Sequence, residues 1–96
     1  MKSLKTIERT LKQHKPMLRE RFKVKSIGVF GSYARAEEGA DSDVDILVEL
    51  TEPIGWKIVD LKEFLEEVLG LRVDIVTTKA LRRELSETIM REVVFA

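Results

Sequence analysis

One segment of the chain, from Gly31 to Asp45, limits the possible folds and functions more than any other. An apolar run ends at Gly31-Ser32, and after ten further residues Asp43-Val44-Asp45 opens a second apolar run. Charges at alternate positions of a strand share one face, and two such carboxylates repel each other unless a cation lies between them. A Gly-Ser turn with free backbone N–H groups suits a phosphate. The segment therefore predicts a phosphate cradle beside a metal-binding carboxylate pair, the combination that nucleotidyl transfer needs.

The composition favours a small folded protein over a nucleic-acid-binding or membrane protein. With 96 residues, of which 44% are hydrophobic, the chain predicts a single domain over residues 1–96. Lys plus Arg and Asp plus Glu both number 17, and the resulting net charge of zero gives no support to direct nucleic-acid binding. No apolar run approaches the roughly 20 residues of a membrane span. We therefore expect a soluble cytoplasmic protein.

The cysteine and histidine content of the chain excludes several kinds of catalytic and metal-binding site. It has no cysteine, which rules out disulfides and thiolate metal sites. His14 is the only histidine, so a histidine-based triad or cluster is excluded. Its Lys and Gln neighbours favour a solvated position on a helix.

The apolar pattern predicts an α+β fold, with a small mixed β-sheet and helices packed mainly on one of its faces. The expected strands are Val24–Phe30, Asp43–Leu50 and Leu71–Val76. The expected helices are one that starts at Leu4 and breaks at Pro16, a short one over Met17–Phe22, one over Tyr33–Glu38, one over Gly55–Leu69, and a C-terminal helical region over Leu81–Val93. Residues 39–42 are expected to form a loop. The other face of the sheet is left for a functional site.

Asp74 is a third candidate carboxylate, because it interrupts the apolar third strand. If this strand adjoins the second, Asp74 faces the same side as Asp43 and Asp45, and the acids define one site. Asp43 and Asp45 would then hold Mg²⁺, which prefers oxygen ligands, and Asp74 would share a metal or accept the proton of an attacking hydroxyl. The alternative is a sheet-edge acid that is solvated or paired with Arg72.

The spacing Gly-Ser, ten residues, Asp-x-Asp resembles the signature of the nucleotidyltransferase superfamily. Within that superfamily, the chain is similar over nearly its whole length to the minimal nucleotidyltransferase (MNT) family. The motifs that carry this similarity are Gly-Ser-x-Ala-Arg at 31–35, Ser-Asp-x-Asp at 42–45 and Arg-x-Asp-Ile-Val at 72–76.

The resemblance implies a set of site residues. These are Gly31 and Ser32 for the triphosphate of ATP, and Asp43, Asp45 and Asp74 for catalysis and Mg²⁺. Arg35 is a further nucleotide-binding candidate that would neutralise phosphate charge, and a solvated helix arginine is the equal alternative. The family usually has glycine at the position of Ala36, so the geometry of this loop depends on whether Ala36 is helical or has a positive φ.

The resemblance also implies a partner and a reaction. MNT proteins pair with a HEPN-domain RNase toxin in prokaryotic toxin–antitoxin modules, and as antitoxins they can transfer AMP from ATP to a tyrosine hydroxyl of the toxin. We therefore expect an Mg²⁺- and ATP-dependent antitoxin in a hetero-oligomer with a HEPN toxin. Two alternatives stay open: a non-catalytic antitoxin that acts by direct binding, and an adenylyltransferase of small molecules. Trp56 is expected in or near the core rather than as a partner contact.

Overall fold

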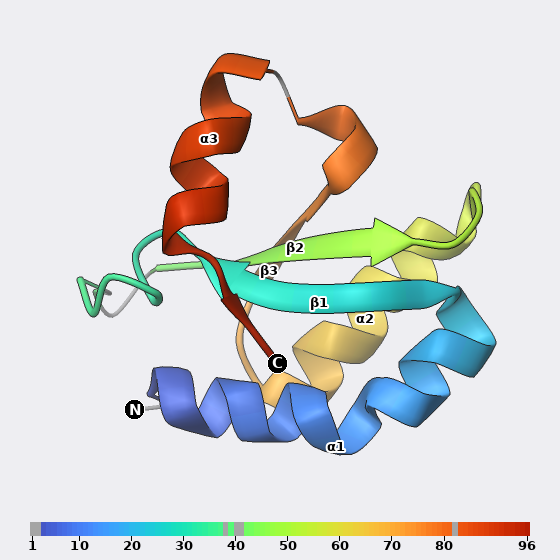
Figure 1. The fold of residues 1–96 in the computed structure, drawn as a ribbon. Helices are drawn as coiled ribbons and strands as arrows, with labels where there is room; N and C mark the ends of the chain where they lie inside the picture. Colours follow the sequence, from blue (N-terminus) through green and yellow to red (C-terminus); the bar gives the residue numbers. More distant parts are fainter. Residues whose placement is uncertain (1–2, 38, 40–41, 82) are drawn as a thin grey trace.

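The computed structural model describes residues 3–37, 39, 42–81 and 83–96, and within them it has a four-stranded sheet with α-helices on both sides (Figure 1). In chain order the elements are α1 (Leu4–Phe22), β1 (Val24–Phe30), β2 (Val44–Leu50), α2 (Lys57–Leu69), β3 (Val73–Thr77), the 3₁₀ helix η1 (Thr78–Ala80), α3 (Arg83–Glu92) and β4 (Val94–Phe95). This mixed sheet with its helices confirms the α+β class. None of the helices in the described ranges combines the length and the apolar character that a membrane span requires.

The strand order of the sheet is β3-β2-β1-β4, which places β2 between two neighbours. β1 pairs antiparallel with β2 and with β4, whereas β2 and β3 run parallel. Parallel strands need a crossover connection, and α2 provides it. As a result, the first residues of β2 and β3 lie side by side, and Asp45 is the register partner of Asp74.

The hydrophobic core lies between the sheet and the helices α1 and α2, which cover one face (Figure 1). The side chains of α2 that reach the core form one helical stripe, as the sequence predicts: Leu61, Leu65 and Leu69. They pack in one cluster with the inward residues of β2, which are Val44, Ile46 and Val48. Burying one such side chain stabilises the fold by about 1.5–3 kcal/mol. The core therefore fixes the inward face of β2 and directs Asp45 to the opposite face.

Helix α1 is continuous, which contradicts the expected break at Pro16 and the separate helix over Met17–Phe22. A proline inside a helix removes one backbone hydrogen bond and costs about 3 kcal/mol. The helix continues because its buried side chains lie on both sides of the proline: Ile7, Leu11, Leu18 and Phe22. Figure 1 shows that α1 bends along its length, which an internal proline explains.

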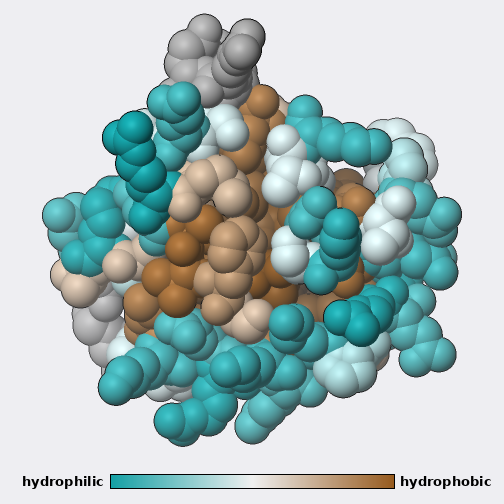
Figure 2. Space-filling model, in the orientation of Figure 1, coloured by the Kyte–Doolittle hydropathy of each residue, from teal (hydrophilic) through white to brown (hydrophobic). Residues whose placement is uncertain are grey.

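The opposite face of the sheet is partly covered by α3, which stands over it (Figure 1). Leu47 is fully buried although it faces away from the α1–α2 core. A Cβ on Gly28 would lie 2.7 Å from a methyl group of Val93, so the chain after α3 lies directly on β1. Figure 2, in the orientation of Figure 1, shows hydrophobic surface at the centre of the view, between α3 and α1, bordered by hydrophilic side chains.

Strand β4 is an element that the sequence analysis missed. It pairs Phe95 with Gly28 and Val94 with Val29. It has only two residues and is separated from α3 by Val93 alone. Its apolar residues therefore look like the continuation of a helical stripe, and only pairing with β1 reveals a strand.

His14 and Trp56 differ from their expected environments. The sequence predicts a solvated His14, but its ring is partly buried, with the centroid 5.5 Å from that of Phe64 in an edge-on arrangement. Trp56 is expected in or near the core, but it is 89% exposed at the start of α2. The largest apolar side chain of the protein is therefore available to contact other molecules.

The connection after β1 is a turn over residues 31–36, not the expected helix over Tyr33–Glu38. It begins with one helix-like hydrogen bond, from the Arg35 N–H to the Gly31 carbonyl at 3.1 Å. It then leaves the helical path at Ala36, whose φ of +57° lies in the left-handed region. Glu38 and residues 40–41 of the expected loop lie outside the described residues.

The substitution Ala36→Gly is expected to raise the free energy of unfolding by about 0.5–1 kcal/mol. A left-handed conformation costs alanine about 1–2 kcal/mol, and the greater freedom of glycine in the unfolded chain offsets about 0.5–1 kcal/mol of the gain. Urea denaturation followed by circular dichroism measures the difference. Ala34→Gly is the matched control, because Ala34 has a negative φ and glycine there should only destabilise. A loss of stability in Ala36→Gly would contradict the left-handed turn.

Candidate active site

The candidate site begins where β1 ends and the chain turns at Gly31. This residue has a φ of +74°, a conformation that glycine adopts without steric cost. It also packs against the carboxylate of Asp45, with which a Cβ at this position would collide. Tyr33 anchors the turn, because its side chain is only 3% exposed and belongs to the core cluster. The turn at Gly31 and the carboxylate of Asp45 on β2 are thus held side by side.

Asp45 and Asp74 are neighbours on the face of the sheet that points away from α1 and α2. They are register partners on β2 and β3, and adjacent strands lie about 4.8 Å apart. The residues that flank each aspartate belong to the core cluster or pack against it, so the aspartates themselves point the other way. The structure therefore brings together these two acids, as the sequence analysis expects for adjoining strands.

The environment of Asp45 disfavours its negative charge. Burial raises the pKa of Asp45 above the ordinary value of 3.8, and the charges of Asp74 and Asp43 raise this pKa further. Arg35 acts in the opposite direction, and Glu92 adds a smaller increase. A divalent cation fits here, because it would remove the repulsion and prefers carboxylate oxygens as ligands.

Asp43 differs from the other two acids, because its carboxylate pairs with Arg72. The Arg72 Nε lies 3.2 Å from Asp43 Oδ1, and the two side chains are 72% and 50% exposed. Arg72 is the alternative partner expected for Asp74, but in the structure it pairs with Asp43. An exposed pair of this kind contributes only about 0–1 kcal/mol. Across the described part of the chain, no three His, Cys, Asp or Glu side chains converge closely enough to hold a metal ion.

Glu92 is a residue of this site that the sequence analysis missed. It is the last residue of α3, and its Oε1 accepts a hydrogen bond from the Gly31 N–H at 3.0 Å. The same carboxylate binds Arg35, whose Nη1 lies 3.1 and 3.0 Å from the two oxygens. Because 61 positions separate Gly31 from Glu92, no local spacing could reveal the contact.

Arg35 lies in the exposed part of the turn and binds two carboxylates. Besides its contact with Glu92, its Nε donates a hydrogen bond to Glu37 at 3.0 Å. The hydrogen bonds to Glu37 and Glu92 raise the pKa of Arg35. Its guanidinium and the Gly31 N–H therefore already form a site for an anionic group, and Ser32 places a partly exposed hydroxyl donor between them in the chain.

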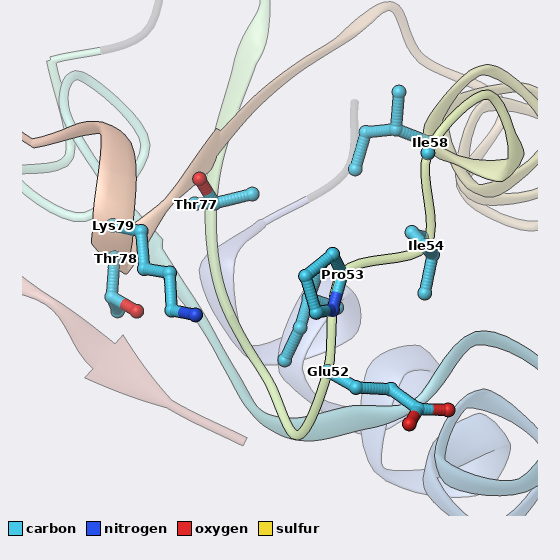
Figure 3. Close-up of a pocket in the computed structure, with 9 residues that line it drawn as sticks. Glu52, Pro53, Ile54, Ile58, Thr77, Thr78 and Lys79 are labelled. Carbon is cyan, nitrogen blue, oxygen red and sulfur yellow. The ribbon is translucent and has the colours of Figure 1, made fainter.

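A separate hollow of about 230 Å³ lies at the other ends of β2 and β3. Figure 3 shows Pro53 and Ile58 on one side of it, across from Thr77 and Lys79. Its lining begins at Leu50, five positions after Asp45, or roughly 16 Å along the strand. The carboxylate pair is therefore not part of this hollow.

Comparison with known proteins places the chain in a family. A family model described as a nucleotidyltransferase domain matches residues 11–96. The protein adenylyltransferase MntA of Thermococcus cleftensis is 52% identical over 96 residues, which cover 99% of this chain and 97% of the relative. A solved structure of a minimal nucleotidyltransferase is 37% identical and superposes with a TM-score of 0.81, covering 97% of this chain and 95% of that one.

Two solved toxin–antitoxin complexes share the fold at lower sequence identity. A chain of a complex with AMP-PNP is 23% identical, with a TM-score of 0.74 over 92% of this chain and 70% of that one. A chain of the complex between tri-AMPylated Shewanella oneidensis HEPN toxin and its MNT antitoxin is 21% identical, with a TM-score of 0.66 over 93% and 70% of the two chains. The family match over most of the chain, together with the fold, leads to one conclusion: this chain belongs to the nucleotidyltransferase domain family and is an enzyme of the minimal nucleotidyltransferase type.

Proposed function

We propose that this protein is an antitoxin that transfers AMP from Mg²⁺-ATP to a tyrosine hydroxyl of a partner HEPN RNase toxin and thereby neutralises it. The observation that carries the proposal is the placement of Asp45 and Asp74 as register partners beside the Gly31 turn. The relative from T. cleftensis, named as a protein adenylyltransferase, supports a protein acceptor over a small molecule. The complex of an MNT antitoxin with an AMPylated HEPN toxin supports the choice of partner.

The proposal gives each residue of the site a role. The Gly31 N–H, the Ser32 hydroxyl and the Arg35 guanidinium bind the β- and γ-phosphates of ATP. The carboxylates that would hold Mg²⁺ are Asp43, Asp45 and Asp74, and the exposed ion pair of Asp43 with Arg72 is weak enough, at about 0–1 kcal/mol, for Asp43 to leave it and join the other two. When bound, Mg²⁺ would neutralise part of the negative charge of the phosphates.

The transfer step follows from these positions. Asp74 is exposed on β3 and accepts the proton of the tyrosine hydroxyl. The tyrosine oxygen forms a bond to the α-phosphorus, the bond from the α-phosphorus to its bridging oxygen breaks, and pyrophosphate leaves. Arg35 and the Gly31 N–H then stabilise the additional negative charge on the leaving pyrophosphate.

Exposed apolar side chains support a hetero-oligomer. Trp56 is 89% exposed and Leu85 is 55% exposed, and they lie on separate elements of the surface. Met90 and Phe95, at 49% and 45%, add further exposed hydrophobic surface near the end of the chain. Contiguous apolar surface, which Figure 2 shows at the centre of its view, marks protein interaction sites, whereas single exposed side chains are common on any protein. This surface also favours a second candidate function, in which the protein neutralises the toxin by binding alone.

The test is incubation of the protein with a HEPN toxin and Mg²⁺-ATP, followed by intact-mass and peptide mass spectrometry of the toxin. We expect one or more AMP units on a toxin tyrosine and a parallel loss of RNase activity. Asp45→Asn serves as the catalytically impaired control. Inhibition of the RNase by this control without ATP, and with no mass increase on the toxin, would instead establish neutralisation by binding alone.

A further inference from the structure

Glu92 holds the same donors that the proposed function gives to the phosphates of ATP. Its Oε1 accepts the Gly31 N–H at 3.0 Å, and both carboxylate oxygens lie within 3.1 Å of Arg35 Nη1. A carboxylate and a phosphate both present anionic oxygens, and both prefer a backbone N–H and a guanidinium as donors. The Glu92 carboxylate therefore occupies the position expected of a terminal phosphate.

The Glu92 carboxylate and a phosphate group cannot occupy this position together. The Gly31 N–H has a single hydrogen to donate, and two anions at contact distance repel each other. Arg35 is further engaged by Glu37, at 3.0 Å, so both sides of its guanidinium carry a carboxylate. A phosphate that enters the turn must therefore replace Glu92.

We propose that Glu92 is an internal competitor for the nucleotide, which lowers the affinity for ATP until the triphosphate displaces its carboxylate from Gly31 and Arg35. This inference rests on the proposed function, because it takes the Gly31 turn as the triphosphate site. Glu92 acts only on the phosphate end of the nucleotide. AMP, which lacks the β- and γ-phosphates, escapes the competition.

The contact also couples the nucleotide site to the end of the chain. Glu92 ends α3 and directly precedes Val93, which lies against Gly28. In Figure 1, α3 stands over the sheet and returns to it at this end. Displacement of Glu92 therefore removes a polar contact that ties the last turn of α3 to the Gly31 turn.

The test is calorimetric titration of Mg²⁺-ATP, Mg²⁺-tripolyphosphate and AMP into the whole chain and its Glu92→Gln variant. We expect Glu92→Gln to bind ATP and tripolyphosphate about tenfold or more tightly, because a charged hydrogen-bonded competitor is removed. The affinity for AMP should not change. Glu87→Gln is the matched control, since Glu87 lies on the same helix with a side chain that is 83% exposed and pairs only weakly with Arg91. This control should bind ATP as the unmodified chain does.

A second variant keeps the test independent of any effect of Glu92→Gln on folding. Glu92→Asp keeps the charge but shortens the side chain, so that it no longer spans Gly31 and Arg35 together, and it should also tighten ATP binding. Equal or weaker ATP binding in folded Glu92 variants, with binding retained in the unmodified chain, would overturn the competitor role alone. Absence of ATP binding in every variant, and in the unmodified chain, would overturn the nucleotide site itself and this inference with it.

Discussion

The substitution Asp45→Asn is expected to reduce AMP transfer by about a thousandfold or more, since the proposed function makes Asp45 a ligand of Mg²⁺ and the loss of such a carboxylate removes several kcal/mol of transition-state stabilisation. The same substitution is expected to raise the free energy of unfolding of the nucleotide-free chain. Asn has the shape of Asp but no charge, so it relieves the burial cost and the repulsion from Asp74 and Asp43. Loss of activity together with a gain in stability is the behaviour of a residue selected for function.

The pH dependence of this gain has a defined sign. Because the pKa of Asp45 is raised in the folded chain, the folded state holds this proton more tightly than the unfolded state does. The stability that protonated Asp45 contributes is complete below the ordinary pKa of 3.8 and is lost as the pH rises through the folded pKa. The difference in unfolding free energy between Asp45→Asn and the unmodified chain should therefore vanish at low pH and be largest at neutral pH.

Thermal unfolding followed by circular dichroism, with and without Mg²⁺, measures this difference. Mg²⁺ should raise the Tm of the unmodified chain and have less effect on Asp45→Asn, because a ligand stabilises only the state that binds it. Asp60→Asn is a matched control, since Asp60 is exposed in the first turn of α2 and favours the helix there, so its loss should give no gain. A lower Tm for Asp45→Asn than for the unmodified chain would contradict the electrostatic account.

Replacement of Gly31 by alanine is expected to lower the free energy of unfolding by about 1.5–4 kcal/mol. The left-handed conformation contributes about 0.5–1 kcal/mol, after the offset from the lower freedom of alanine in the unfolded chain. The collision of the new Cβ with the Asp45 carboxylate contributes about 1–3 kcal/mol. AMP transfer should fall about a hundredfold or more in the protein that remains folded, because the collision displaces a reacting-site carboxylate. Urea denaturation and the toxin-modification assay measure the two effects.

Gly55→Ala separates the two contributions at Gly31. Gly55 has a φ of +56°, and a Cβ there would meet nothing within 4 Å, so this variant should lose only the net conformational contribution of about 0.5–1 kcal/mol. The double variant Gly31→Ala/Asp45→Ala removes the colliding carboxylate and should recover part of the lost stability. If Gly31→Ala costs no more than Gly55→Ala, the close approach of Gly31 to Asp45 is wrong.

The parts of this fold that follow from sequence are those specified by local patterns. The strand expected over Asp43–Leu50 is observed from Val44 to Leu50, because its run of apolar residues and the following Pro53 both lie within a few residues. The stripe of α2 is equally local, and Gly70 ends the helix in a left-handed conformation, as a C-terminal glycine commonly does. The adjacency of Asp45 and Asp74 could be predicted only if β3 was assumed to lie beside β2, because the residues of a strand do not specify which strand is its neighbour.

The parts that sequence did not predict depend on contacts between distant segments. A proline within a helical pattern predicts a break, and this local rule fails at Pro16 because buried side chains on both sides of it hold α1 together. The contact of Glu92 with Gly31 joins the two ends of a long chain segment, and β4 exists only through its pairing with β1. Trp56 follows Pro53 at the start of α2, where a helical pattern does not reveal which side faces solvent.

In both β2 and β3, the position of the aspartate relative to the preceding buried residue decides whether its carboxylate reaches the site. Each aspartate directly follows a buried valine, Val44 before Asp45 and Val73 before Asp74. Side chains alternate along a strand, so one residue inserted between valine and acid would turn the carboxylate toward the core. Exchange of one apolar residue for another keeps this order. During evolution the two strands can therefore change much of their composition, whereas one residue inserted at this point abolishes the site in one step.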